Sequence, residues 1–368
     1  MSDPYATPQG TSRCAERFGG RTATGHYRTW RDLRISSIGI GTYLGSPDDE
    51  TDERYEAAIV EAVRSGANHI DTAINYRCMR SERAVGRALA RLIEEEVATR
   101  DEIFLATKGG YLPFEREPPS DTDAYIKRRF LDPGLVKKSE LAGDGTHSLG
   151  RRFLRDQVER SRANLGVDCI DLYYLHNPEV QAAALAKVDF LARIRSAFDV
   201  MEEFVEAGAI RSYGVSSWDA FRVPPSARQH VALEDLLEQA ERVAGNSHHF
   251  AAVQLPFNPA MMEGFALNGQ PRQGGLVSAF EAISSEGLLC ATSSPLLQGR
   301  LLKAFPAFLT AGMKGFDTHA ARALQFARSV PGIHTVLVGM SDPFHVAENL
   351  AVTREKPLDE EELMALFG

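Results

Sequence analysis

Hydrophobic positions alternate between two spacings over most of the chain. Runs of consecutive apolar residues are typical of buried strands, and apolar residues three or four positions apart are typical of one helix face. The first helical stripe consists of Tyr55, Ala58, Ile59, Ala62 and Val63. Thr51 is expected to cap this helix and Gly66 to end it, and Ser81 is expected to cap the next helix. The pattern therefore predicts repeated strand–helix units.

Eight of the apolar runs are predicted to be central strands, and a helical pattern follows each one. The runs are residues 38–42, 67–71, 103–108, 170–175, 210–215, 251–255, 288–292 and 335–339. Later helices are expected near 231–244, 275–286, 319–329, 343–351 and 359–367. This count predicts an α/β protein, a closed (β/α)8 TIM barrel. An open doubly wound sheet is the alternative, and it is disfavoured because no GxGxxG motif follows the first strand.

Two segments fall outside the alternation. Residues 1–24 are polar and are expected to form a flexible tail, which leaves 25–368 as a single barrel domain. Residues 109–148, after the third strand, contain several prolines, five large apolar or aromatic residues and the basic run Lys127–Arg129. This long insert is interpreted equally well as a lid over a substrate, including an acidic or phosphorylated one, or as a surface loop or subunit contact.

Composition narrows the class of protein. The 41 basic and 50 acidic residues give a net charge of −9, which argues against a general nucleic-acid binder. The four cysteines form no CxxC pair, so neither a metal site nor a disulfide framework is expected. No signal peptide or membrane span is recognised, and a cytoplasmic location is expected. The absence of heptads excludes a coiled coil, and the oligomeric state is left open.

Four titratable residues follow neighbouring strands of the predicted barrel. Asp71, Lys108 and His176 end the second, third and fourth strands, and Tyr76 lies in the loop after the second. Singly, these residues are more often caps, solvated lysines or structural histidines. Together, at the end of a barrel where active sites lie, they favour catalysis. An ammonium lowers the pKa of a nearby phenol, a carboxylate holds the ammonium, and an imidazole orients a carbonyl oxygen. Such a group suits carbonyl reduction with hydride from a nicotinamide cofactor.

The chain resembles the aldo-keto reductases. The resembling motifs are IGIGTYLG (38–45), DTAINYR and SERAVGRAL (71–89), ATKGG (106–110), IDLYYLHNPE (170–179), GAIRSYGVSSW (208–218), VQLPFNP (253–259), SSPLLQGRLL (293–302) and LVGM to ENL (337–350). The resemblance implies a barrel plugged by an N-terminal β-hairpin near 27–37. It also implies a catalytic tetrad. In this tetrad Tyr76 donates the proton, Lys108 and Asp71 adjust the pKa of Tyr76, and His176 orients the carbonyl.

The resemblance further implies a site for NAD(P)H. The cofactor-binding positions it assigns are Gly41, Thr42, Ser216, Ser217, Gln254, Ser293, Ser294, Leu296, Gln298, Gly339, Met340, Ser341, His345, Glu348 and Asn349. Ser216, Ser217 and Gln254 are expected at the nicotinamide carboxamide. The Ser294–Gln298 loop is expected at the pyrophosphate, and Glu348 and Asn349 are expected at the adenine.

Four of these positions depart from the family pattern. Ser217 replaces the usual Asn, and Ser293 replaces an aromatic residue that stacks on the nicotinamide. Gly339 and His345 replace the Lys and Arg that clamp the 2′-phosphate of NADPH, which gives a slight preference for NADH. Arg300, Lys303 or Arg322 are alternative sources of a cation.

The leading hypothesis is therefore an NAD(P)-dependent oxidoreductase that interconverts a small-molecule carbonyl compound and its alcohol. One alternative is a nucleotide-binding regulatory subunit, because some members of the family act mainly as partners of other proteins. Another is a non-redox enzyme that reuses the tyrosine, lysine, aspartate and histidine, for example in an elimination.

Overall fold

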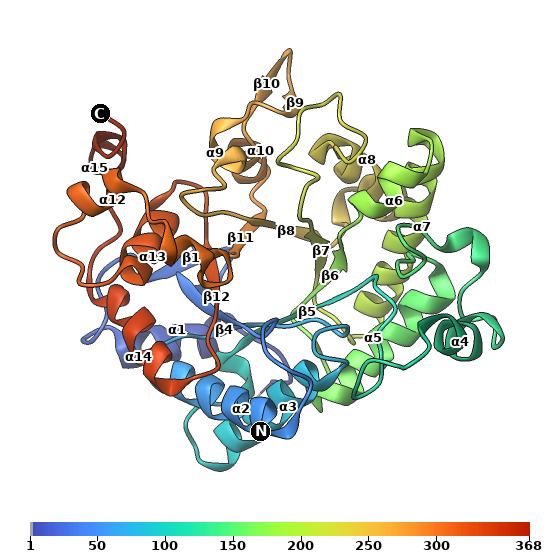
Figure 1. The fold of residues 1–368 in the computed structure, drawn as a ribbon, viewed down its shortest axis with the longest axis horizontal. Coiled ribbons are helices and arrows are strands. Elements are labelled where there is room, and N and C mark those ends of the chain that lie inside the picture. Colours follow the sequence, from blue (N-terminus) through green and yellow to red (C-terminus); the bar gives the residue numbers. More distant parts are fainter. Residues whose placement is uncertain (1–2) are drawn as a thin grey trace.

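The computed structural model describes residues 3–368. In this part of the chain, eight parallel strands close into a central barrel, in the order β11-β12-β3-β4-β5-β6-β7-β8 (Figure 1). The barrel strands are β3 (Ile38–Gly41), β4 (His69–Asp71), β5 (Phe104–Gly109), β6 (Leu172–His176), β7 (Tyr213–Ser216), β8 (Phe250–Pro256), β11 (Leu289–Ser293) and β12 (Thr335–Gly339). The predicted (β/α)8 barrel is confirmed.

One helix of an outer ring follows each strand and packs on the outside of the barrel (Figure 1). These helices are α2 (Asp49–Arg64), α3 (Arg80–Glu94), α5 (Arg151–Leu165), α7 (Lys187–Glu206), α8 (Leu233–Ala244), α10 (Ala279–Ser285), α13 (His319–Ser329) and α14 (Pro343–Ala351). The remaining helices are α1 (Pro8–Phe18), α4 (Thr122–Ile126), α6 (Glu179–Ala184), α9 (Glu263–Ala266), α11 (Arg300–Lys303), α12 (Ala307–Gly312) and α15 (Glu360–Ala365). Single helical turns of other types are η1 (Arg100–Glu102), η2 (Lys127–Leu131), η3 (Lys138–Glu140), η4 (Gly245–Ser247), η5 (Leu297–Gly299) and η6 (Val352–Arg354).

Two helix starts differ from the sequence prediction. Helix α2 begins at Asp49 because the Asp48 carboxylate accepts the N–H of Thr51 at 2.8 Å, so Asp48 is the cap and Thr51 lies inside the first turn. Helix α3 begins at Arg80 with no side-chain cap. The Ser81 hydroxyl instead donates to the carbonyl of Thr42 at 2.8 Å, which ties the start of α3 to the loop after β3.

The predicted helix at 275–286 is shorter than expected. Residues 270–277 form an antiparallel hairpin, β9 (Gln270–Arg272) and β10 (Gly275–Val277). Helix α10 follows, and the Ser278 side chain accepts the N–H of Glu281 while the Glu281 carboxylate accepts that of Ser278. The capping pair therefore sets the start of the helix, which the apolar spacing alone does not reveal.

The N-terminal end of the barrel is closed by a hairpin, as predicted. Strands β1 (Tyr27–Trp30) and β2 (Leu33–Ser36) pair antiparallel, with Tyr27 opposite Ser36. Trp30 and Ile35 of this hairpin pack on Phe104 and other side chains inside the barrel. This packing removes the apolar floor of the barrel from water and leaves the opposite end open.

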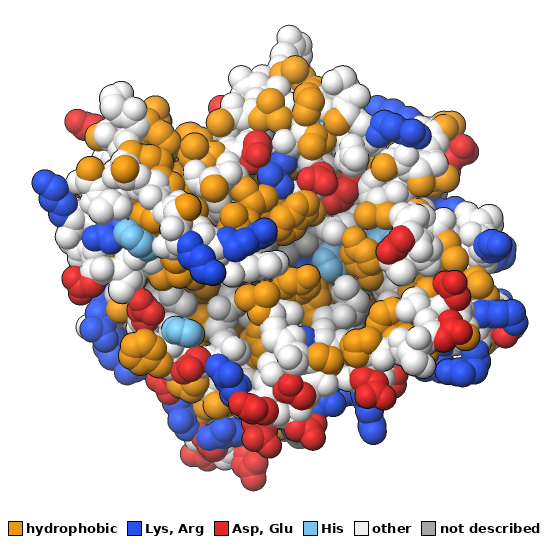
Figure 2. Space-filling model, in the orientation of Figure 1, with side chains coloured by type: hydrophobic (Ala, Val, Ile, Leu, Met, Phe, Trp, Pro, Cys, Tyr) orange, Lys and Arg blue, Asp and Glu red, His pale blue; other side chains and the backbone are white. Residues whose placement is uncertain are grey.

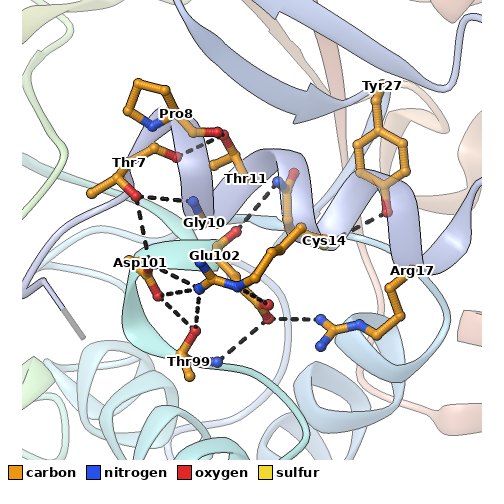
Figure 3. Close-up of polar contacts among 12 residues, drawn as sticks. Thr7, Pro8, Gly10, Thr11, Cys14, Arg17, Tyr27, Thr99, Asp101 and Glu102 are labelled. Carbon is orange, nitrogen blue, oxygen red and sulfur yellow. Dashed lines mark hydrogen bonds and ion pairs between the residues drawn. The ribbon is translucent and has the colours of Figure 1, made fainter. Parts of the chain in front are cut away.

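The expected flexible tail differs from the structure over residues 8–18, which form helix α1. Thr7 caps this helix by accepting the N–H of Gly10 at 3.0 Å (Figure 3). Arg13 binds the Asp101 carboxylate at 2.9 Å, and Arg17 binds that of Glu102 at 2.7 Å. The polar composition suggested mobility, but these polar side chains have buried acidic partners about ninety positions away.

Close contacts and apolar packing also hold α1. A Cβ added at Gly10 would lie 2.1 Å from the carbonyl oxygen of Asp101, so only glycine permits this approach. Cys14, Phe18 and Tyr27 form a small buried cluster, and the Tyr27 hydroxyl donates to the carbonyl of Gly66 at 2.6 Å. The helix is therefore an integral part of the closed end of the barrel.

The insert at 109–148 largely packs on itself. It contains α4, η2 and η3, and Ile126, Phe130 and Val136 form a buried cluster with Phe153 of α5. Lys127 of the basic run is exposed and pairs with Asp132 of the same segment at 2.9 Å. These contacts correspond to the surface-loop interpretation over most of the insert.

No helix of residues 3–368 combines the length and apolarity required to cross a membrane. The same residues contain no cluster of three or more His, Cys, Asp or Glu side chains that could hold a metal ion.

Candidate active site

The carboxyl ends of the strands surround a cavity of about 570 Å³. Figure 2 shows a hollow at this face, bordered mostly by hydrophobic and uncharged side chains, with Lys and Arg side chains to its left and acidic side chains gathered at the lower edge of the molecule. The cavity is lined by Gly41, Thr42, Tyr43, Leu44, Asp71, Asn75, Tyr76, Tyr111, His176, Asn177, Ser216, Ser217, Trp218, Gln254, Ser293, Ser294, Pro295, Leu296, Gln298, Gly299, Leu337, Val338 and Gly339. The open end of the barrel therefore collects residues from most of the strands.

A buried ion pair lies beneath the cavity. Lys108, at the end of β5, is fully buried, and its ammonium donates to the Asp71 carboxylate at the end of β4. It also donates to the carbonyl of Thr72 at 2.8 Å. Burial lowers the pKa of Lys108 and raises that of Asp71, and the attraction between the two charges opposes both shifts. The Lys108 ammonium and the Asp71 carboxylate therefore each stay charged because the other is charged.

Tyr76 lies above this pair. The Lys108 nitrogen is 5.0 Å from the centre of the Tyr76 ring, over its face. Burial, followed by the charge of Asp71, raises the pKa of the Tyr76 phenol well above its ordinary value. The residue types in the sequence predict a lowered pKa for this phenol, and the shift in the structure is the opposite. Burial dominates, and the Lys108 ammonium donates its hydrogen bonds to Asp71 and Thr72, so the phenol keeps its proton at neutral pH.

The loop after Tyr76 has an unusual backbone. Arg77, Cys78 and Met79 all have positive φ, at 48°, 58° and 65°. Such conformations cost of order 1–3 kcal/mol each and persist only where surrounding contacts hold them. The buried Arg77 side chain supplies those contacts by donating to the carbonyl of Ser46 at 2.9 Å and by pairing with Asp52.

His176, at the end of β6, borders the cavity beside Tyr76. The centres of the two rings are 5.8 Å apart in an edge-to-face arrangement. Burial, followed by the charge of Lys108, lowers the pKa of His176 well below its ordinary value. The imidazole is therefore neutral at physiological pH. Its Nδ1 atom is buried and has no hydrogen-bond partner within the described residues.

A chain of hydrogen bonds continues from the ion pair along the cavity wall. Gln254 of β8 donates from Nε2 to the second Asp71 oxygen at 2.9 Å, and Ser216 donates to Gln254 Oε1 at 2.8 Å. The Ser217 hydroxyl accepts the N–H of Ala220 at 2.8 Å, so part of its capacity is used within its own loop.

The loop that carries Ser217 and Trp218 is held in place by the buried carboxylate of Glu179. Glu179 Oε1 accepts the N–H groups of Trp218 at 2.7 Å and Asp219 at 3.0 Å. Burial raises the pKa of Glu179. Trp218 is part of the cavity wall, so Glu179 determines where this wall lies without lining the cavity itself.

The loop after β11 supplies a turned backbone segment. Ser294, Leu297 and Gln298 have positive φ between 48° and 56°, and Asn258 donates to the carbonyl of Ser294 at 2.9 Å. Of the predicted cofactor residues in this segment, Ser293, Ser294, Leu296 and Gln298 all line the cavity.

The segment after β12 is only partly at the cavity. Gly339 lines it, but Met340 is buried in the hydrophobic core and Asn349 is buried in α14. Ser341, His345 and Glu348 also lie outside the cavity lining, and His345 is exposed. The predicted residues therefore divide into a group around the cavity and a group beside α14.

Several cavity residues were missing from the predicted set. Tyr43, Asn177 and Trp218 each lie one or two positions beyond the end of a barrel strand. Tyr111 was assigned only to the insert, and it is the insert residue that lines the cavity. Reading every residue that follows a strand, aromatic residues included, would have found all four.

A sequence model described as "Aldo/keto reductase family" matches residues 37–366, nearly all of the barrel. This match and the fold define the class of the protein, an NAD(P)-dependent oxidoreductase that acts on carbonyl groups. The chain belongs to the aldo/keto reductase family.

Individual relatives are distant. The chain is 23% identical over 342 residues to the uncharacterized oxidoreductase YqkF of Bacillus subtilis, covering 91% of this chain and 92% of that protein. It is 29% identical over 194 residues to the NADH-specific methylglyoxal reductase of Escherichia coli, and that match spans 51% of this chain and only 50% of the relative. An aldo/keto reductase structure from Klebsiella pneumoniae, solved with NADP and acetate, aligns over 94% of both chains with a TM-score of 0.61 and 20% identity.

Proposed function

We propose that the protein interconverts a small aldehyde or ketone and the corresponding alcohol, with Tyr76 as the general acid and base. The observation that carries this proposal is the buried Lys108–Asp71 pair directly beneath the Tyr76 ring, at a cavity that His176 also lines. A protonated phenol, a fixed positive charge and a neutral imidazole at one cavity are the groups that carbonyl reduction requires.

In the direction of reduction, the Tyr76 hydroxyl gives its proton to the carbonyl oxygen. Lys108 stabilises the phenolate that remains, and Asp71 keeps the ammonium charged and in place. The neutral imidazole of His176 holds the carbonyl oxygen by a hydrogen bond. The hydride for the carbonyl carbon would be supplied by NAD(P)H held beside Ser216 and Gln254, because no side chain can donate hydride.

The residues around Ser216 and Gln254 fit a nicotinamide carboxamide. The Gln254 amide nitrogen carries two hydrogens and uses one on Asp71, and the Ser216 oxygen keeps lone pairs free after donating to Gln254. A carboxamide needs one acceptor and one donor, and this pair offers both. NAD(P)H is therefore the proposed cofactor.

We expect the protein to prefer NADH over NADPH. Gly339 and the exposed His345 offer no fixed positive charge to a 2′-phosphate. Arg54 of α2 reaches the same segment and donates to the carbonyl of Ser341 at 3.3 Å, but it is shared with the Asp342 carboxylate at 3.7 Å. A carboxylate in this place repels the phosphate of NADPH. The Escherichia coli relative described as NADH-specific supports this choice.

The substrate is proposed to be an uncharged small molecule. Within the described residues, no lysine or arginine lines the cavity, and Tyr43, Tyr111 and Trp218 provide apolar surface. The basic run of the insert does not reach the cavity, which argues against an acidic or phosphorylated substrate.

A direct test combines binding and turnover. The chain has two tryptophans, of which Trp218 lines the cavity and Trp30 is buried at the closed end. NADH is expected to quench the Trp218 fluorescence, and the Trp218→Phe variant should lose this signal while calorimetry still detects binding. The wild type should then oxidise NADH in the presence of benzaldehyde or glyceraldehyde.

Two outcomes would overturn the proposal. Folded protein that binds neither NADH nor NADPH by calorimetry has no cofactor site and points to non-redox chemistry. Protein that binds a cofactor but turns over no aldehyde or ketone points to a regulatory subunit.

A further inference from the structure

His147, at the end of the insert, lies directly beneath His176. The insert leaves β5 and returns beside its own beginning, where Leu112 donates to the carbonyl of Thr146 at 2.7 Å and Ser148 donates to that of Gly110 at 2.8 Å. This short pairing places His147 opposite Tyr111 and buries it completely. The end of the insert is therefore part of the support of the candidate active site.

The hydrogen bonds of His147 define the state of its ring. Gln181 of α6 places its amide nitrogen 3.2 Å from His147 Nδ1, and His147 Nε2 lies 2.8 Å from the carbonyl oxygen of His176. Because an amide nitrogen only donates, Nδ1 accepts and Nε2 carries the hydrogen that binds the His176 carbonyl. Burial lowers the pKa of His147 to about 4, which keeps the ring neutral in this arrangement.

Tyr111 joins the two histidines. Its ring centre is 5.0 Å from that of His147 and 5.2 Å from that of His176, both edge to face. Its hydroxyl accepts from the Asn177 amide at 3.0 Å. Gly110 permits this packing because a Cβ there would lie 2.9 Å from the His176 carbonyl oxygen, and its φ of 145° suits glycine.

Among residues 3–368, no hydrogen-bond partner fixes the direction of the His176 imidazole. Its buried Nδ1 has no partner in this part of the chain, so the ring depends on its backbone and on edge contacts with Tyr76 and Tyr111. His147 contacts both the His176 backbone and the Tyr111 ring. We infer that His147 is a positioning residue for the proposed carbonyl chemistry, which acts by holding the backbone of His176 and the ring of Tyr111 in place.

This inference rests on the proposed function, and its kinetic test uses NADH with benzaldehyde. In His147→Leu, kcat should fall roughly tenfold to a hundredfold, the range of a small displacement near the reacting groups. The dissociation constant for NADH should stay within about twofold because the cofactor residues are untouched. His147→Gln keeps a side-chain donor to the carbonyl and should recover most of the loss.

A matched control is available at His230. Its Nε2 lies 2.8 Å from the carbonyl oxygen of Gly269, in a half-buried loop that does not line the cavity. His230→Leu should keep the wild-type kcat. Equal losses of kcat in both Leu variants would show general loosening and overturn the inference, and so would an unchanged kcat in His147→Leu.

A second test, by NMR of protein with ¹⁵N-labelled histidine, does not depend on turnover. The His147 signals are identified by their loss in His147→Gln. They should show an Nε2–H tautomer that stays neutral well below the pKa of about 6.5 of a free imidazole. The His176 signals should shift in the same variant. A His147 that titrates as a free imidazole, with unchanged His176 signals, would refute the positioning role even if the wild type reduced no aldehyde. Absence of turnover in the wild type would count against the proposed function alone.

Discussion

The Lys108 ammonium lies over the face of the Tyr76 ring, 5.0 Å from its centre, while its hydrogen bonds go to Asp71 and Thr72. The positive charge therefore stabilises the electrons of the whole ring and leaves the phenol hydroxyl free for a substrate. In this arrangement the phenol is protonated at rest, and the charge acts once the proton has left.

The Tyr76→Phe variant separates proton transfer from cofactor binding. Phenylalanine keeps the ring over Lys108 and removes only the hydroxyl. NADH affinity should stay close to that of the wild type, and kcat for aldehyde reduction should fall at least about a hundredfold, the scale of a lost general acid. Stopped-flow measurement of hydride transfer would check this, and near-normal turnover would assign the proton to another group.

The Lys108→Met variant should lose stability as well as activity. Removing one partner of a buried ion pair leaves the other charge uncompensated, which costs about 3–5 kcal/mol. Asp71 would respond by binding a proton, so the free energy of unfolding of this variant should rise as the pH is lowered toward 5. Urea unfolding of Lys108→Met and the double variant Lys108→Met with Asp71→Asn provides the check. The double variant should recover stability without recovering activity, and failure to recover it would contradict the uncompensated-charge argument.

The close contact at Gly10 predicts a large effect from a single methyl group. Alanine usually stabilises a helix by about 0.5–1 kcal/mol relative to glycine. At Gly10 its Cβ would lie 2.1 Å from the Asp101 carbonyl oxygen, so α1 must shift away from the ion pairs of Figure 3. Gly10→Ala should lower the free energy of unfolding by about 1–3 kcal/mol. Gly20→Ala is the control and should be neutral, because no atom of residues 3–368 lies within 4 Å of the added Cβ.

Buried His147 also predicts a pH dependence of stability. Its folded pKa of about 4 lies below the value of about 6.5 for an unfolded chain, so the unfolded state binds the proton first as the pH falls. The contribution of neutral His147 to the free energy of unfolding is therefore fully present above pH ~6.5. Between pH ~6.5 and pH ~4 it declines by about 1.4 kcal/mol per pH unit. The stability advantage of the wild type over His147→Gln should shrink by this slope. Replacement of exposed His345 by Gln is the control, and parallel curves for the wild type and His147→Gln would contradict the prediction.

Glu179→Ala should weaken cofactor binding through the cavity wall. The change leaves the N–H groups of Trp218 and Asp219 without their acceptor, at about 1–3 kcal/mol for each such buried group. The loop carrying Ser217 and Trp218 should loosen, and NADH affinity should fall several-fold by calorimetry. Glu179→Gln keeps one acceptor oxygen and should remain near the wild type, whereas equal losses in both variants would indicate that the negative charge matters.

The sequence predicted the barrel well because strand and helix spacing are local signals. Asp71, Lys108 and His176 each end a predicted strand, so the sequence alone places them at one end of the barrel. Helix α1 was missed because its ion pairs have distant partners, Asp101 and Glu102, and its buried apolar residues, Cys14 and Phe18, are too few to form a recognisable stripe. His147 was missed because its hydrogen-bond partner, the carbonyl of His176, is distant in the sequence and no local pattern indicates it.

The pKa of Tyr76 shows a second limit of sequence reasoning. The residue types suggested that an ammonium would lower the phenol pKa, and the outcome depends on where the ammonium points and how deeply the phenol is buried. Likewise, the aromatic residues of the insert could equally have faced a substrate. In the structure Phe114, Tyr125 and Phe130 pack edge to face on one another, whereas Tyr111 lines the cavity.

The pairing of β3 with β12 has a consequence for synthesis. The first barrel strand lies between the second and the last, with Ile38 opposite Val336. A chain emerging from the ribosome therefore exposes one unpaired edge of β3 until nearly all of the protein has been made. Unpaired edges invite association with other chains, so nascent forms of this protein depend on β12 for protection from aggregation.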